Sequence, residues 1–126
     1  MGTVSSHKDL LVWQKSVSLA SRIYAATAAL PSDERYGLST QMRRAAVSVA
    51  SNIAEGAGRS SRGEYIQFLN VARGSLSELE TQILIAGNLQ LIDKNLGLDE
   101  SASEIGKMLT SLIQRLRERR ELAARR

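Results

Sequence analysis

The chain has 126 residues, a length typical of one domain that buries a core without metals or disulfides. It contains no Cys and one His, which excludes disulfides, thiolate zinc sites and cysteine nucleophiles and fits a reducing compartment. No apolar run approaches the roughly 18 residues that span a bilayer, and residues 1–8 do not resemble a signal peptide. We therefore expect a cytoplasmic protein without a membrane partner.

The positive charge is unevenly distributed along the chain. Residues 115–126 hold six Arg and two Glu, so this segment accounts for the whole formal net charge of +4. In the rest of the chain, arginines gather before residue 74 and acidic residues dominate residues 78–104. Such a separation favours an anionic partner or an oriented association between copies of the chain.

A first helix is predicted over residues 9–30. Asp9 is the candidate N-cap, and Pro31 ends the helix because proline supplies no amide hydrogen. The helical period is carried by an apolar stripe, flanked by Val12, Leu19 and Ile23, that consists of Trp13, Val17, Ala20 and Tyr24.

A second helix is predicted over residues 38–57. One apolar stripe defines it: Leu38, Met42, Ala45, Val49 and Ile53. Its other faces combine polar groups with Ala46, Ala50 and Ala54, which are small enough for close backbone approach. We expect this helix to be covered on several sides, by its own fold or by another subunit.

A glycine turn leads into the third and fourth helices. Gly56 and Gly58 are expected to permit the backbone reversal, and Ser61 with Glu64 has the spacing of a capping box. The third helix carries a heptad seam of Tyr65, Leu69, Ala72, Leu76, Leu79, Ile83 and Ala86. The pattern breaks at residues 93–98, and Asp99 or Ser101 is expected to start a fourth helix that carries Ile105, Leu109, Leu112 and Leu116.

Four helices with short connections predict an all-α, antiparallel up-down-up-down four-helix bundle. The bundle is expected to comprise residues 9–117, with a mobile segment at residues 1–8 and a basic tail at residues 118–126. The core should be aliphatic, with Trp13, Tyr24, Tyr65 and Phe68 as its larger anchors.

The loop at residues 56–63 is the best candidate for an anion site. Glycine amides, hydroxyl groups, Arg59, Arg62 and the start of the third helix together suit a phosphate or a sulfate. The loop lacks the spacing of a Walker motif. The alternative is a glycine-permitted turn with exposed arginines.

Asn52, Glu55 and Arg59 share one face of the second helix, which we expect to approach Gln67, Asn70 and Arg73. A catalytic carboxylate needs a partner acid, base, nucleophile or metal, and no such partner is found. We therefore interpret Asn52 and Glu55 as a structural polar face. No catalytic residue, metal ligand or cofactor is predicted.

The arginine-rich end of the fourth helix suits the backbone of a nucleic acid, with Arg115, Arg119 and Arg120 as candidate contacts. No aromatic residues lie between these arginines, so binding would be led by phosphate contacts. The alternative is a solvated helix end whose cations complement the helix dipole.

The chain resembles the bacterial four-helix-bundle family, also called the 23S rRNA intervening-sequence protein family. The resemblance extends over roughly residues 9–117, and its most specific part is SNIAEG at residues 51–56. It also rests on Glu34, Gln41, Arg59 and the segments LVWQK (11–15), LP (30–31), GL (37–38), RRA (43–45), FL (68–69) and ARGSLSELE (72–80).

The resemblance implies a small cytoplasmic all-α protein that assembles into a pentameric ring without enzyme activity. A related accessory protein of diversity-generating retroelements forms a similar basic barrel that engages a reverse transcriptase and nucleic acid. We therefore predict an oligomeric scaffold that binds RNA, DNA or a nucleic-acid-processing protein. Its first candidate contacts are Arg43, Arg44, Arg59, Arg62 and Arg73. The alternative is a protein-binding module whose arginines form salt bridges between subunits.

Overall fold

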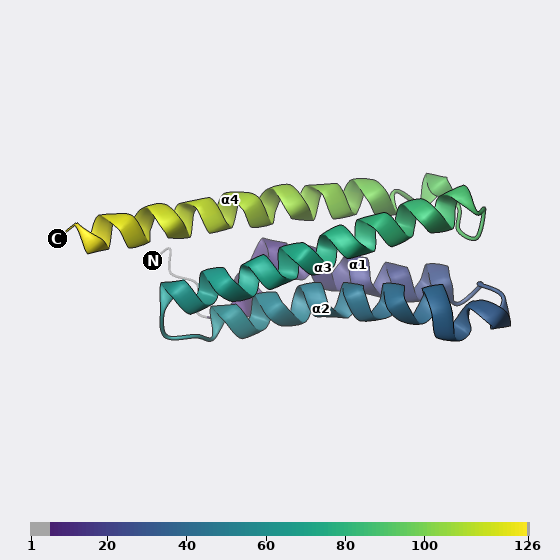
Figure 1. Ribbon diagram of the computed structural model, residues 1–126, viewed down its shortest axis with the longest axis horizontal. Helices are drawn as coiled ribbons and strands as arrows, with labels where there is room; N and C mark the ends of the chain where they lie inside the picture. The colour runs from purple at the N-terminus through teal and green to yellow at the C-terminus, as the bar shows by residue number, and fades with distance from the viewer. Residues whose placement is uncertain (1–5, 126) are drawn as a thin grey trace.

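The computed structural model describes residues 6–125, without the side chains of residues 9, 35 and 36. This part of the chain contains no strand and forms four long helices: α1 (Leu11–Thr27), α2 (Thr40–Ala57), α3 (Arg62–Asn88) and α4 (Leu98–Ala124). The helices alternate in direction along one long axis (Figure 1). The prediction of an all-α protein with four helices is confirmed.

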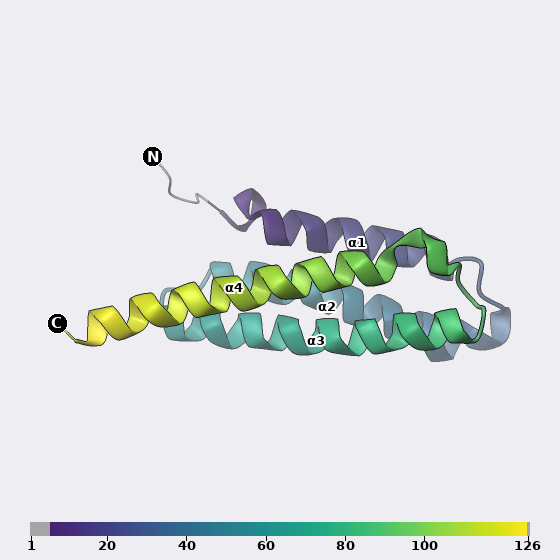
Figure 2. The same cartoon turned by 90° about the horizontal axis from the view of Figure 1, so that it is seen from above.

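Each long helix packs against two others, in the cyclic order α1, α2, α3, α4 and back to α1. Seen from above, α4 lies obliquely, so that it begins beside α1, crosses the start of α3 and continues beyond it (Figure 2). Four short helical turns complete the described chain: η1 (His7–Asp9), η2 (Ser32–Glu34), η3 (Arg35–Ser39) and η4 (Lys94–Leu96).

The core between the helices is aliphatic, as predicted. The predicted stripe of α2 is buried from Met42 to Ile53, and the seam of α3 is buried from Leu69 to Ala86. From α4 the core receives Ile105, Leu109, Ile113 and Leu116. Leu112 is only partly buried, because Ile113 takes its predicted place.

The buried face of α1 differs from the predicted stripe. The core receives Val12, Leu19 and Ile23 together with two polar residues, Ser16 and Thr27. Their hydroxyl groups donate hydrogen bonds within the helix, from Ser16 Oγ to the Val12 carbonyl and from Thr27 Oγ1 to the Ile23 carbonyl, each at 2.7 Å. A hydroxyl group that is hydrogen-bonded can be buried at little cost in free energy. The helix therefore buries this face in preference to the predicted apolar stripe.

The predicted stripe of α1 consequently lies at the edge of the core and is only partly covered. Val17 is 38% exposed and Tyr24 is 44% exposed, whereas Trp13 and Ala20 are partly buried. Tyr24 is therefore not a core anchor. Of the other predicted anchors, Trp13 and Tyr65 pack against the core, and Phe68 is partly buried.

Two helix starts differ from the predicted caps. Leu10, not Asp9, occupies the N-cap of α1 and provides no side-chain cap. Gly97, not Asp99 or Ser101, is the N-cap of α4, with a left-handed backbone at φ 73° that favours glycine. The predicted end of the first helix at Leu30 was also late, since α1 ends at Thr27 and Leu30 N–H closes a turn onto the Thr27 carbonyl.

Candidate nucleic-acid interface

The turn between α2 and α3 does not use its glycines for a left-handed backbone. Gly58, the C-cap of α2, has φ −85° and ψ −3°, values that other residues adopt readily. Gly56 is buried inside α2, where a Cβ atom would lie 2.8 Å from the Cβ of Phe68. Gly56 therefore serves close packing of α2 on α3, rather than the predicted backbone reversal.

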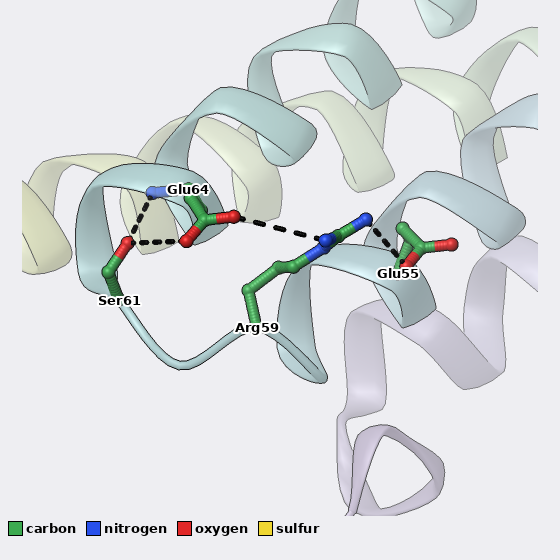
Figure 3. Close-up of polar contacts among 4 residues, drawn as sticks. All are labelled: Glu55, Arg59, Ser61 and Glu64. Atoms are coloured by element: carbon green, nitrogen blue, oxygen red, sulfur yellow. Dashed lines mark hydrogen bonds and ion pairs between the residues drawn. The ribbon is translucent and has the colours of Figure 1, made fainter.

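A polar network of four side chains holds this turn together (Figure 3). Ser61 caps α3, because its Oγ accepts a hydrogen bond from the Glu64 N–H at 3.1 Å and donates one to Glu64 Oε1 at 3.2 Å. Arg59 Nη2 lies 3.0 Å from Glu55 Oε2, and Arg59 Nη1 lies 3.9 Å from Glu64 Oε2. The Arg59 guanidinium also lies over the Phe68 ring, 4.7 Å from its centroid.

This network bears directly on the anion site predicted for residues 56–63. The carboxylate of Glu64 lies in the first turn of α3, where the helix dipole favours a negative charge. Arg59 is shared between two carboxylates, while Arg62 is exposed and makes no hydrogen bond or ion pair with the described residues. The geometry favours a capped turn over a self-contained anion site.

The end of α4 adds further arginines to the same end of the bundle. A Cβ atom on Gly63 would lie 3.2 Å from Arg120 Nη1, so the Arg120 guanidinium rests on the first turn of α3. Every described residue from 117 to 125 is exposed, and the last turns of α4 project past the α2–α3 turn (Figure 1). We call this region the basic end and define it by its exposed arginines, Arg59, Arg62, Arg115, Arg117, Arg119 and Arg120.

Three predicted contacts lie away from the basic end. Arg43 closes the C-terminus of α1, with hydrogen bonds to Thr27 Oγ1 at 2.9 Å and to the Tyr24 carbonyl at 3.3 Å. Arg73 is partly buried and donates a 2.8 Å hydrogen bond to Asn70 Oδ1. Arg44 is exposed near the start of α2 and bonds to none of the described residues.

The polar face of Asn52 and Glu55 is satisfied within α2 and its turn. Asn52 Nδ2 donates to the Ser48 carbonyl at 2.8 Å and to Ser48 Oγ at 3.0 Å. Ser48 Oγ in turn lies 2.8 Å from Ser75 Oγ, which links α2 to α3. Of the residues that this face was expected to approach, Gln67, Asn70 and Arg73, the structure places Arg73 in a groove between α3 and α4, where it bonds to Asn70 and not to Asn52 or Glu55.

The sequence reasoning missed Arg22, which ties α1 to the connection between α3 and α4. Its guanidinium donates to Ser101 Oγ at 2.7 Å and to the Leu96 carbonyl. In the sequence it is one of two charged residues in α1, with Lys15, and no spacing or motif sets it apart. Within residues 6–125, no three His, Asp or Glu side chains gather as a metal site, and no helix is long and apolar enough to cross a membrane.

Residues 8–111 match the model of the family described as 23S rRNA-intervening sequence protein. The chain belongs to this family. The resemblance found in the sequence is thereby confirmed. No curated protein is significantly similar to the chain.

A solved structure supports the fold assignment of this intervening-sequence family member. It is the crystal structure of a protein of unknown function, from the S23 ribosomal protein family of Bacteroides thetaiotaomicron VPI-5482. The two chains are 27% identical and superpose with a TM-score of 0.76, over 82% of this chain and 96% of the other. The likeness concerns the fold and does not assign a function.

Proposed function

We propose that this protein is the subunit of a cytoplasmic, non-enzymatic homo-oligomer, a ring of five, that binds nucleic acid through its basic end. One observation carries the proposal: α4 crosses the start of α3, so arginines far apart in sequence lie at one end of the bundle. RNA and DNA are both candidate ligands, as is a protein that processes them.

Phosphate contacts are the interaction this surface suits best. Arg62, Arg115, Arg117 and Arg119 are exposed and bond to none of the described residues, so their guanidinium groups are available to a ligand. Each cation that neutralises a phosphate releases a condensed counterion, which makes binding favourable at low salt. A ring would present several basic ends together and raise the avidity of a weak single contact.

The second candidate is a protein-binding or assembly module without affinity for nucleic acid. This candidate is favoured because some of the arginines already bind protein groups within the chain. Arg43 bonds to α1, and Arg59 pairs with Glu55 and Glu64. In that case the exposed arginines of the basic end would form salt bridges with a protein partner. The two candidates differ in whether any RNA or DNA is retained at low salt.

The proposal is tested by RNA-binding titrations of two matched variants, Arg62→Gln and Arg44→Gln. Both positions carry an exposed arginine without a partner among the described residues, but only Arg62 lies in the basic end. We expect Arg62→Gln to make the negative slope of log K against log salt shallower, by about 0.7–0.9 per lost phosphate contact, with Arg44→Gln close to wild type. Equal effects would contradict a contact at the basic end. An absence of binding at low salt would favour the protein-binding module.

A further inference from the structure

The exposed part of the α1 stripe, Val17 and Tyr24, belongs to a surface that no other part of the described chain covers. Val17, Ala20 and Tyr24 of this stripe line a shallow groove with residues of α2. We call this surface the α1–α2 face, and its residues are Val17, Ala20, Ser21, Tyr24, Val47, Ala50 and Ser51. Val17, Tyr24 and Val47 are 38, 44 and 43% exposed.

The α1–α2 face carries no charge, although 24% of the residues in the chain are charged. At its edge, the Arg43 guanidinium lies over the Tyr24 ring, 4.6 Å from the centroid, and is held by Thr27 and the Tyr24 carbonyl. A helical period that continues outside the core, on a surface without charges, is typical of a packing face between helices. Such a face suits another helical bundle better than a nucleic acid.

The opposite side of the bundle offers a complementary groove. Because the helices pack in cyclic order, the α3–α4 side lies opposite the α1–α2 side. Its groove is lined by Leu76 and by small residues, which include Ser77, Ser103, Gly106 and Thr110. The charged residues of the lining are Arg73, Glu80 and Lys107. A Cβ atom on Gly106 would lie 3.4 Å from Leu76 Cδ2, so a hollow adjoins Leu76.

The register between α2 and α3 sets the protruding residues level with this hollow. The contact between Ser48 and Ser75 aligns the two antiparallel helices, which places Val47 level with Leu76 and Arg43 level with Glu80. Glu80 is exposed and forms no ion pair with the described residues. If two parallel copies lie side by side, Val47 of one copy therefore meets the hollow beside Leu76 of the other, and Arg43 meets Glu80.

We infer that copies of this chain pack side by side, with the α1–α2 face of one copy in the α3–α4 groove of the next. Val47 inserts beside Gly106, and Arg43 faces Glu80 across the contact. The contact joins two different surfaces, so it repeats from copy to copy and can close into a ring. This inference rests on the self-assembly in the proposed function and assigns the surfaces that carry it.

The test uses Val47→Arg and Thr110→Arg, each of which blocks one of the two surfaces and leaves the other intact. Light scattering after size exclusion should show the wild-type oligomer reduced to a single chain in each variant. An equimolar mixture should form a two-chain complex and nothing larger, because only one intact face and one intact groove remain. Helical circular dichroism and thermal melts establish that each variant is folded.

Val71→Arg is the matched control, since Val71 is an exposed valine, 49% accessible, outside both surfaces. It should retain the wild-type mass. A wild-type oligomer that survives Val47→Arg or Thr110→Arg, or that dissociates equally with Val71→Arg, would overturn the assigned surfaces alone. A wild-type protein that is monomeric at all concentrations would contradict the self-assembly on which the inference rests.

Discussion

At Gly56, the absence of a side chain sets the distance between α2 and α3. A methyl group there would lie 2.8 Å from Phe68 Cβ and 3.2 Å from the Tyr65 carbonyl oxygen. Overpacking of this kind costs about 1–3 kcal/mol, more than the gain in helix propensity of roughly 1 kcal/mol from glycine to alanine. Gly56→Ala should therefore lower the free energy of unfolding, as measured by chemical denaturation.

Gly74 supplies the control for this prediction. It also lies within a long helix, but nothing lies within 4 Å of the position that its Cβ atom would take. Gly74→Ala should stabilise the protein by up to about 1 kcal/mol through helix propensity alone. If both substitutions stabilise the protein, Gly56 does not hold the two helices at close approach.

Tyr65, which packs beside Gly56, should make the free energy of unfolding fall as the pH becomes alkaline. Burial raises the pKa of its hydroxyl above the ordinary value of 10.0. The folded state then holds this proton more tightly than the unfolded state, so the stabilisation is present below pH 10.0 and is lost as pH rises through the folded pKa. Denaturant titrations should show a smaller loss above that pH for Tyr65→Phe. Identical pH profiles would contradict this account.

At the scale of elements, the start of α3 depends on one hydroxyl group. Ser61 accepts the Glu64 N–H and donates to the Glu64 carboxylate, so Ser61→Ala removes both contacts. We expect a loss of about 1 kcal/mol in the free energy of unfolding, the usual effect of deleting an N-cap. Ser60→Ala, at an exposed neighbour without these bonds, should stay within about 0.5 kcal/mol of wild type. Equal losses would argue against the cap.

The positions of the four helices could be predicted from their apolar periodicity, and three of them carry one dominant apolar stripe. The face that α1 buries could not be predicted, because this helix has two candidate stripes and the buried one includes Ser16 and Thr27. Their hydroxyl groups are satisfied by carbonyls of the same helix, a compensation that apolar periodicity does not reveal. The N-cap at Gly97 was missed for a similar reason, since its left-handed backbone is a property of the turn.

The sequence predicted which arginines belong to the candidate site, but not how they are arranged in space. Charge counts alone single out the tail and the residues around Arg59. They do not show that α4 crosses α3 at Gly63, or that Arg43 and Arg59 are already engaged within the chain. Both facts depend on helix lengths and crossing geometry, which arise from tertiary packing.

At the scale of the whole molecule, different parts of the surface have different proposed roles. The basic end is proposed to bind nucleic acid, while the α1–α2 face and the α3–α4 groove are proposed to join copies. A monomeric Val47→Arg variant should therefore still bind RNA, but more weakly than the oligomer because avidity is lost. Titrations at low salt compare the two, with Val71→Arg expected to match wild type. Unchanged affinity in the monomer would show that assembly does not contribute to binding.

Assembly and nucleic-acid binding are tested together by light scattering coupled to size exclusion, with and without a short structured RNA and a DNA of equal length. We predict a homo-oligomer that co-elutes with nucleic acid at low salt and releases it as salt rises. An oligomer that co-elutes with neither nucleic acid at any salt concentration would contradict nucleic-acid binding. A monomer would contradict assembly.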